Sequence, residues 1–266
     1  MGYGYRDKIV VITGASSGIG RAAAVDLAER GAIVCAAARR EEQLRELVVS
    51  LPGDGHSYRV CDVSDRVQVK DLADYVRARY ARCDILINSA GFSRHRRLTA
   101  DDSIEVLEAV MSTNFLGAVY CTKELLSMLL EARPGHVVNI ASVAGRIPVG
   151  GNAAYSASKF ALVGWSEAMH SELAGRGVFV SSVEPGPVPT EGFPQTAMVR
   201  HPVFRLGLAT TTDVTKAVRN AIEKRKVHRT VPRPYYLIQL LRLVAPKPWR
   251  AIQAFVIGAR DRSTGR

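Results

Sequence analysis

A tyrosine and a lysine stand four residues apart, at Tyr155 and Lys159, in the stretch NAAYSASKFALVGW. Residues with this spacing share one face of an α-helix, so a helix here places the lysine ammonium near the tyrosine hydroxyl. A positive charge beside a phenol lowers its pKa toward the range in which the hydroxyl exchanges protons at neutral pH. The pair therefore suits a general acid/base. Taken alone, the pattern also fits an ordinary helix with a half-buried tyrosine and a solvated lysine.

The glycine-rich stretch TGASSGIG is a second candidate, because it follows the apolar run IVVIT and precedes a helical segment. Glycines let the backbone turn tightly and approach a pyrophosphate, and the helix offers its free N–H groups to the anion. The spacing is G-x-x-x-G-x-G rather than G-x-G-x-x-G. Such a turn can be purely structural, but beside a Tyr-x-x-x-Lys pair it indicates a dinucleotide site. Its expected cofactor-binding residues are Gly14, Ser16, Ser17, Gly18, Ile19 and Gly20.

The apolar pattern of the chain predicts the scaffold that positions these residues. Continuous apolar runs mark strands that are covered on both faces, as in a parallel sheet. The runs are residues 9–13, 32–38, 84–88, 136–142 and 178–185, and helical segments at 21–30, 68–80, 103–131 and 155–174 lie between them. The prediction is an α/β fold of the Rossmann type, a doubly wound parallel sheet with helices on both faces. Ligands of such a sheet bind beyond the carboxyl ends of its strands.

Length and composition set further limits. A chain of 266 residues that is 47% hydrophobic suits one large domain. Its four cysteines are widely spaced, without a C-x-x-C pair, so neither a metal site nor a disulfide framework is expected. The start MGYGYRDK has no apolar export region, and we expect no apolar run of about 18 residues that would span a membrane. These features predict a cytoplasmic protein.

Seven short motifs, in order, resemble the short-chain dehydrogenase/reductase family from Asp7 to about Arg225. They are TGASSGIG, CDV at 61–63, NSAG at 88–91, Asn114 in TNFLG, Ser142 in NIASVAG, YSASK at 155–159 and PGPVPT at 185–190. One departure is Ser89, where the family most often has a second asparagine. The resemblance implies a Rossmann-fold catalytic domain over residues 1–225 and an oxidoreductase that uses a nicotinamide cofactor.

The resemblance also implies a role for each of four catalytic residues, Asn114, Ser142, Tyr155 and Lys159. Tyr155 is expected to donate or accept the proton. Lys159 is expected to lower the pKa of Tyr155 and to hold the nicotinamide ribose. Ser142 is expected to bind the substrate oxygen, and Asn114 to position a water in a proton relay that reaches Lys159.

The cofactor preference follows from AAARREE at the end of the second predicted strand. NAD enzymes place an acid there for the ribose 2′-hydroxyl, and NADP enzymes place an arginine near the 2′-phosphate. No acid ends this strand and Arg39 and Arg40 follow it, which favours NADP. Alternatively both arginines are solvated and Glu41 contacts the ribose. The family pattern assigns to the cofactor, besides Tyr155 and Lys159, the residues Asp62, Val63, Asn88, Ala90, Gly91, Pro185, Gly186, Val188 and Thr190.

The substrate is expected under a variable loop at about 191–211, which carries several apolar residues, among them Phe193 and Phe204. An apolar lid indicates a lipophilic alcohol, ketone or aldehyde, although these side chains can equally pack on the body of the fold. The predicted function is an NADP-dependent oxidoreductase that interconverts such an alcohol and its carbonyl compound. The alternatives are a 3-oxoacyl-thioester (carrier-protein) reductase and, from another class, a non-catalytic NADP-sensing or scaffold protein.

Residues 226–266 form a basic, amphipathic C-terminal segment. From Lys224 onward, eleven Lys or Arg stand against a single acid, Asp261, which gives +10 of the net charge of +11. Basic residues that flank apolar helices with aromatic edges suit an anionic membrane surface. Equally, the segment can close the pocket or form a subunit interface. Nucleic-acid binding is not expected, because no recognised motif accompanies the charge. We expect a homo-oligomer. The stretch RTVPRPYY stands where the commonest tetramers of the family have a last strand that ends with a Gly-rich, Asp-containing segment, so this chain departs from that tetramer pattern.

Overall fold

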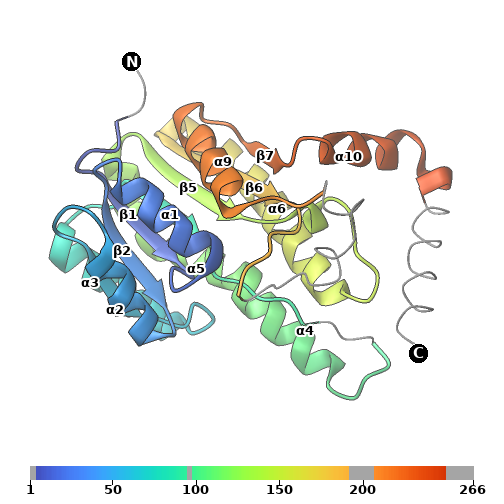
Figure 1. Cartoon of the computed structure of the whole chain (residues 1–266), viewed down its shortest axis with the longest axis horizontal. Coiled ribbons are helices and arrows are strands. Elements are labelled where there is room, and N and C mark those ends of the chain that lie inside the picture. Colours follow the sequence, from blue (N-terminus) through green and yellow to red (C-terminus); the bar gives the residue numbers. More distant parts are fainter. Residues whose placement is uncertain (1–3, 95–97, 192–206, 250–266) are drawn as a thin grey trace.

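The structure is a computed structural model that describes residues 4–94, 98–191 and 207–249 (Figure 1). Seven parallel strands form a single sheet in the order β3-β2-β1-β4-β5-β6-β7. The strands are β1 (Ile9–Thr13), β2 (Ile33–Ala38), β3 (Ser57–Val60), β4 (Ile85–Asn88), β5 (Gly135–Ile140), β6 (Val178–Pro185) and β7 (His228–Val231). The helices are α1 (Gly18–Ala28), α2 (Glu41–Ser50), α3 (Arg66–Tyr80), α4 (Ser103–Met111), α5 (Gly117–Ala132), α6 (Ala153–Leu173), α9 (Thr211–Glu223) and α10 (Tyr235–Val244). This confirms the predicted Rossmann-type architecture.

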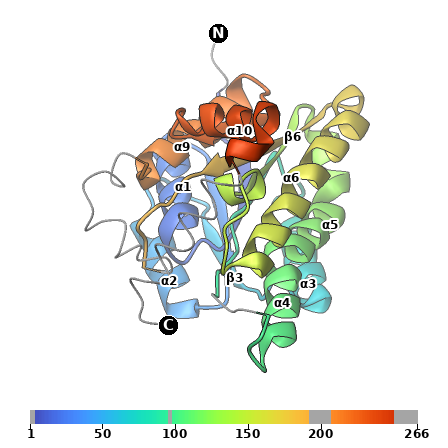
Figure 2. The same ribbon diagram turned by 90° about the vertical axis from the view of Figure 1, so that its right-hand side faces the viewer.

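Helices cover both faces of the sheet, as the continuous apolar strands require. Successive residues of a strand point to opposite faces. Val10 and Ile12 of β1 accordingly pack in one core with α1, α2 and α9, whereas Val11 packs in a second core with α3, α5 and α6. Figure 2 shows the sheet between these two helical layers.

The strand order reverses between β1 and β4, so the switch point of the sheet lies at their carboxyl ends. Thr13 of β1 is level with Asn88 of β4, and Asn88 is level with Asn139 of β5. Ligands of doubly wound sheets bind at this place. The loops that follow β1, β4, β5 and β6 therefore define the candidate site.

The helix predicted over residues 103–131 is interrupted. Between α4 and α5 the π-turn η1 (Ser112–Leu116) contains Asn114. The stretch Ser103–Ala132 is long and apolar enough to cross a membrane by length and composition, contrary to our expectation that no run qualifies. Within the fold, however, α4 packs on α6 and α5 packs on α3 and β5. The stretch is therefore part of the layer that covers the sheet, with Ile104 and Leu107 of α4 left exposed.

Two edge strands were not predicted. β3 and β7 are short and partly exposed, so neither has the continuous apolar run by which the inner strands are recognised. The segment predicted as a basic, amphipathic C-terminal segment, 226–266, includes β7, which pairs with β6 from Ser182↔His228 to Pro185↔Val231. Its backbone groups complete the sheet, and the part of the C-terminal segment that leaves the sheet begins after Val231.

Candidate active site

The glycine-rich loop after β1 approaches the loop after β4 closely. Gly14 has φ +66°, and a Cβ at this position would lie 2.7 Å from the backbone N of Ala90. A Cβ at Gly20 would lie 2.4 Å from the carbonyl oxygen of Gly14, so the start of α1 also requires glycine. The cradle is thus lined by backbone, as a pyrophosphate at a helix N-terminus needs. Ser16, Ser17 and Ile19 lie in the same turn, between Gly14 and Gly20.

Buried hydrogen bonds hold the turn after β4. The Thr13 hydroxyl oxygen accepts from the backbone N–H of Ser89 at 3.2 Å and of Ala90 at 3.3 Å. The Asn88 amide points into the core and donates to Asn139 Oδ1 at 2.9 Å. Asn88 therefore positions the turn that contains Ala90 and Gly91, and its side chain is turned away from the cofactor cradle.

The loop after β3 supplies Asp62 and Val63. Asp62 Oδ1 accepts from the backbone N–H and the hydroxyl of Ser64, and its Oδ2 lies 3.7 Å from Arg39 Nη1. Val63 is buried, and a Cβ at Gly117 would lie 2.6 Å from its Cγ2. Arg39 itself is 70% exposed. The geometry thus leaves Arg39 extended into solvent beside an acid.

Arg40 lies over the glycine-rich loop. Its Nη2 donates to Ser17 Oγ at 2.6 Å and to Ser16 Oγ at 3.1 Å, and its Nη1 pairs with Glu191 Oε1 at 3.1 Å. This guanidinium therefore joins the end of β2 to the start of α1. A planar, permanently charged donor at this place matches the geometry of a phosphate monoester.

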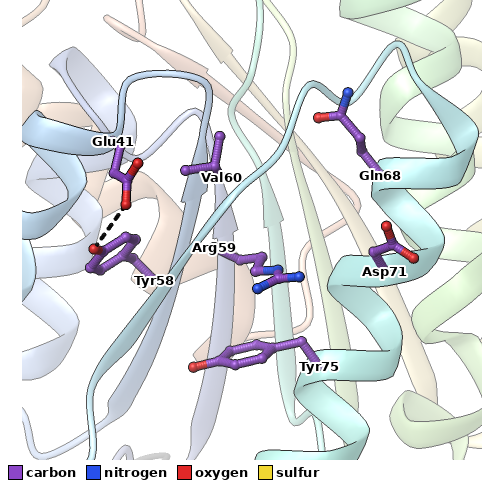
Figure 3. Close-up of a pocket in the computed structure, with 7 residues that line it drawn as sticks. All are labelled: Glu41, Tyr58, Arg59, Val60, Gln68, Asp71 and Tyr75. Carbon is purple, nitrogen blue, oxygen red and sulfur yellow. Dashed lines mark hydrogen bonds between the residues drawn. The ribbon is translucent and has the colours of Figure 1, made fainter.

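Glu41, the alternative contact for the ribose, points elsewhere. Its Oε1 accepts from the hydroxyl of Tyr58 on β3 at 3.3 Å, across the open edge of the sheet (Figure 3). The same hollow is lined by Arg59 and Tyr75, which form a cation–π pair at 5.5 Å. The structure thus favours the arginines over Glu41 at the end of β2.

The segment after β6 crosses the cradle from the other side. The Gly186 N–H donates to the Val231 carbonyl at 2.6 Å, which ties the turn after Pro185 to β7. Val188 is buried in the core, and Thr190 lies next to the glycine-rich loop, since a Cβ at Gly18 would lie 3.3 Å from Thr190 Cγ2. Of the loop expected at 191–211, residues 192–206, with Phe193 and Phe204, lie outside the described residues.

Ser142 lies directly after β5 and caps the short turn η2 (Val143–Gly145). Its Oγ accepts from the Ala144 N–H at 3.1 Å and donates to the Pro185 carbonyl at 3.4 Å. A Cβ at Gly145 would lie 2.6 Å from the Lys159 carbonyl oxygen, so this turn rests directly on α6. Close packing of η2 on α6 thereby brings Ser142 to the neighbourhood of Tyr155, whose pKa the serine hydroxyl lowers.

Lys159 is 4% exposed, and its Nζ donates to the Ile140 carbonyl at 2.8 Å. Burial lowers the pKa of Lys159 to about 8. The same Nζ lies 5.7 Å from the centroid of the Tyr155 ring. The three residues thus form one cluster, with the lysine held at the end of β5.

The pKa of Tyr155 differs from our expectation. Burial raises it above the ordinary value, and the hydrogen bond with Ser142 opposes this rise. In this structure the Lys159 ammonium donates to the Ile140 carbonyl, and burial disfavours its charged form. Its expected lowering of the Tyr155 pKa stays a prediction.

Asn114 lies beside this cluster in η1. Its Oδ1 accepts from the Phe92 N–H at 2.9 Å, while its Nδ2 donates to the Phe92 carbonyl at 2.9 Å and to Ser158 Oγ at 3.1 Å. A Cβ at Gly91 would lie 3.1 Å from Asn114 Oδ1 and 3.5 Å from Lys159 Nζ. Asn114 therefore fixes the loop after β4 against α6, and its role in a proton relay stays a prediction.

Several residues of the site were not identified from the sequence. Ser158 holds Asn114, Gly145 allows η2 to approach α6, and Tyr235 packs on Gly186. Ser158 and Gly145 lie inside recognised motifs, so their proximity to Tyr155 was a usable signal. Tyr235 lies 49 positions beyond Gly186 in the sequence. No local pattern indicated that contact.

The cradle fits a nicotinamide dinucleotide. Backbone lines its pyrophosphate end, Arg40 lies at the ribose end of β2, and the Ser142–Tyr155–Lys159 cluster lies at the ends of β5 and α6. Such a cofactor supplies or accepts a hydride when bound. The cluster provides the matching proton chemistry, because a tyrosine hydroxyl that is hydrogen-bonded to a serine can exchange a proton with an alcohol or carbonyl oxygen.

Comparisons with known proteins agree with this site. The short chain dehydrogenase family matches residues 8–198. The 3-oxoacyl-[acyl-carrier-protein] reductase FabG of Thermotoga maritima is 36% identical over 75% of this chain and 85% of its own length. Farnesol dehydrogenase of Aedes aegypti is 37% identical over 71% and 80%. The structure of a short chain dehydrogenase/reductase from Burkholderia phymatum in complex with NAD has a TM-score of 0.80 at 27% identity, covering 90% of this chain and 94% of that one. The chain belongs to the short-chain dehydrogenase/reductase family, whose oxidoreductases act with a nicotinamide cofactor.

Proposed function

We propose that this protein is an NADP-dependent oxidoreductase that interconverts a lipophilic alcohol and its ketone or aldehyde. The observation that carries the proposal is the packing of the Ser142 turn on α6, with the buried Lys159 ammonium 5.7 Å from the centroid of the Tyr155 ring. Ser142 orients the substrate oxygen, Tyr155 transfers the proton, and Lys159 holds the sugar next to the nicotinamide. Asn114 keeps the loop after β4 against this cluster and serves the proton relay.

The preference for NADP rests on Arg40. Its guanidinium is already held over Ser16 and Ser17, and Glu41 is engaged by Tyr58. The residues that line the rest of the cofactor are those of the cradle, from Asp62, Val63 and the turn at 88–91 to the segment after Pro185. A non-catalytic NADP-sensing protein is the less favoured alternative, because the structure brings the catalytic side chains together rather than leaving one out.

A lipophilic substrate is supported by two observations. The farnesol dehydrogenase relative is named for an isoprenoid alcohol. Ile147 and the 40% exposed Val149 follow Ser142 closely in the chain, so apolar side chains lie near the expected catalytic serine in sequence. The second candidate is a 3-oxoacyl-thioester reductase, since a relative of similar identity carries that name and a basic surface suits an acidic carrier protein.

The test is turnover with NADPH against ketones of increasing chain length, with a short 3-oxoacyl-thioester in parallel. We expect kcat/KM to rise with chain length for the simple ketones, because each buried CH₂ contributes about 0.8 kcal/mol. Tyr155→Phe is the matched control, with an expected loss of about 10²- to 10⁴-fold in kcat and unchanged cofactor binding. Preferential turnover of the thioester establishes the second candidate instead. Turnover of none of these compounds favours the non-catalytic alternative.

We further propose a homo-oligomer in the cytoplasm that works at or near a membrane surface. The four cysteines are buried free thiols, as a reducing compartment allows. On α4, Ile104 is 51% and Leu107 37% exposed, which provides an apolar surface for a second copy. Size-exclusion chromatography with light scattering tests the oligomer, and a monomer at all concentrations contradicts it.

A further inference from the structure

The helix α10 carries two unlike faces. One face holds it to the body: Tyr236 accepts from the Thr230 N–H at 3.3 Å, Gln239 donates to Thr230 Oγ1 at 3.4 Å, and the Arg242 guanidinium lies 5.2 Å from the centroid of the Phe160 ring. Arg242 also bonds the Arg146 carbonyl. With Tyr235, these residues recur at the spacing of one helical face.

The other face of α10 is apolar and exposed. Leu237, Leu240, Leu241, Leu243 and Val244 are 71%, 54%, 38%, 76% and 70% exposed. By helical spacing Leu237, Leu240, Leu241 and Val244 share the side of α10 opposite these contacts, and Leu243 lies at its border, next to the position of Tyr236. We call these five residues the leucine face, and α10 extends past β7 on the side of the molecule opposite α2 and α3 (Figure 1). Exposed apolar patches of this kind mark interaction sites in folded proteins. The described part of the body leaves the leucine face exposed, because the polar contacts of α10 hold the other side of the helix.

The charge around α10 indicates which kind of partner can bind the leucine face. The exposed Arg233 precedes the helix and the exposed Lys247 follows it. From residue 224 to the end, the sequence has a single acid. A second copy of the same surface would bring like charges together, which is unfavourable. A bilayer with anionic lipids instead accepts the leucines in its interface and attracts each nearby basic residue by about 1 kcal/mol.

α10 is also joined to the region that receives the substrate. The Tyr235 hydroxyl donates to the Gly207 carbonyl at 3.3 Å, and a Cβ at Gly186 would lie 2.8 Å from Tyr235 Cε2. Gly186 and Gly207 lie on either side of residues 187–206, which include most of the expected substrate loop. Tyr235 thus joins α10 to the described residues on both sides of this loop.

We propose that the leucine face of α10 docks the enzyme on an anionic lipid bilayer, with its substrate entrance beside the lipid. The bilayer then serves as the reservoir of the lipophilic substrate, a step that rests on the proposed function. Docking buries the leucines in the interface while Arg233 and Lys247 meet the headgroups. The helix lies on the membrane and does not span it, because its length is far below the roughly 20 residues that a span needs.

The experiment is sedimentation of the full chain with mixed phosphatidylcholine–phosphatidylserine vesicles, and with pure phosphatidylcholine vesicles in parallel. We expect strong binding to the anionic vesicles that falls as salt rises, since salt screens exposed charges. The double variant Leu237→Ser/Leu243→Ser should bind more than tenfold less, because two apolar side chains no longer enter the lipid interface. The control Val49→Ser/Val67→Ser replaces residues that are 82% and 69% exposed on α2 and α3, and should bind like the unaltered protein.

Three results overturn the proposal. The first is an unaltered protein that stays in the supernatant at low salt. The second is a double variant that binds as well as the control, which would assign binding to the basic tail alone. The third is a double variant whose oligomer size changes while neither it nor the unaltered protein binds vesicles, which would assign the leucine face to contact with a second copy.

Vesicle binding requires no turnover, so an enzyme that reduces lipophilic ketones but does not bind vesicles refutes this inference alone. Vesicle binding without turnover of any ketone or thioester refutes the proposed function instead.

Discussion

At the scale of single residues, the site depends on how burial acts on two titratable groups. Burial disfavours the charged form of each, so it raises the pKa of Tyr155 and lowers that of Lys159. The hydrogen bond with Ser142 acts in the opposite direction on Tyr155. We therefore expect Ser142 to have two tasks, because it is proposed to orient the substrate oxygen and its hydroxyl lowers the pKa of Tyr155.

In Ser142→Ala, the rise of the alcohol-oxidation rate with pH should shift to higher pH. The phenolate of Tyr155 loses its hydrogen bond, so its pKa rises further and a higher pH is needed to form the base. Loss of a donor at the reacting oxygen should also lower kcat by about 10²- to 10³-fold. The pH dependence of kcat measures both effects. Ser171→Ala, at the exposed end of α6, is the control. If the rate of the Ser142 variant rises over the same pH range as that of the unaltered protein, Ser142 does not have this role.

Lys159→Met should abolish turnover and yet stabilise the fold at pH 7. The pKa of Lys159 falls from 10.5 to about 8 on folding, so the buried ammonium lowers stability by about 3 kcal/mol below pH 8. The cost disappears as pH rises from about 8 to 10.5, where the unfolded chain binds the extra proton. Loss of the hydrogen bond to the Ile140 carbonyl removes about 1 kcal/mol of this gain in stability.

Urea unfolding of both proteins at pH 7 and pH 10 checks this expectation. The advantage of the methionine variant should shrink at pH 10, where the unaltered protein no longer holds a buried charge. An advantage that is the same at both pH values shows that Lys159 does not titrate as described.

Arg40→Ala should weaken NADPH by about 10- to 100-fold and leave NADH nearly unchanged, because only NADPH has the 2′-phosphate that the guanidinium meets. Arg39→Ala is the matched comparison. Its side chain extends into solvent beside Asp62, so we expect a smaller effect than for Arg40. Dissociation constants from cofactor fluorescence measure both. Equal losses for NADPH and NADH in the Arg40 variant assign this residue to the structure of the glycine-rich loop.

At the scale of elements, the decisive contact is between η2 and α6. A Cβ at Gly145 would meet the backbone carbonyl of Lys159. Backbone atoms within a helix cannot move aside as the end of a flexible side chain can. Gly145→Ala should therefore displace Ser142 from Tyr155 and lower kcat by about 100-fold, since misplacement of about 1 Å has such an effect. NADPH affinity should change little.

Gly164→Ala is the control within the same helix. Nothing lies within 4 Å of a Cβ at Gly164, so this variant should keep its activity and gain up to about 1 kcal/mol of stability from helix propensity. Steady-state kinetics and urea unfolding compare the two variants. Normal kcat in Gly145→Ala means that η2 adjusts without moving Ser142.

Elements were predicted from the sequence wherever burial is complete. The inner strands β1, β2, β4, β5 and β6 have continuous apolar runs, because both of their faces are covered. The edge strands β3 and β7 lack this signal because solvent covers part of each. The same reason hid the true start of the C-terminal segment, since a pairing with β6 decides it.

At the scale of the whole molecule, the cofactor links loops that are far apart in the sequence. Gly14, Ala90 and Thr190 meet at one cradle through contacts between β1, β4 and the segment after β6. A ligand that binds this cradle only in the folded state stabilises the whole chain. NADPH at about 100 times its dissociation constant should thus add about 2.7 kcal/mol and raise the melting temperature.

Thermal denaturation with NADPH or with NADH, at equal concentrations, tests this prediction and compares the two cofactors. The shift should be larger for NADPH in the unaltered protein, and Arg40→Ala should remove the difference. A larger shift with NADH contradicts the assignment of NADP, whereas no shift with either cofactor contradicts the cradle itself.

The sequence alone determined the fold class and the glycine-rich turn, because these depend on local spacing and on burial that repeats along the chain. The four expected catalytic residues came from the resemblance of its motifs to those of the family. Only the tertiary structure decided that the Ser142 turn packs on α6, that Arg40 rather than Glu41 faces the glycine-rich loop, and that Tyr235 joins α10 to Gly186. Each of these contacts joins two different elements of the fold, so close packing sets them rather than local pattern. The pKa of Lys159 follows the same rule, since the residues that bury it come from distant strands and loops.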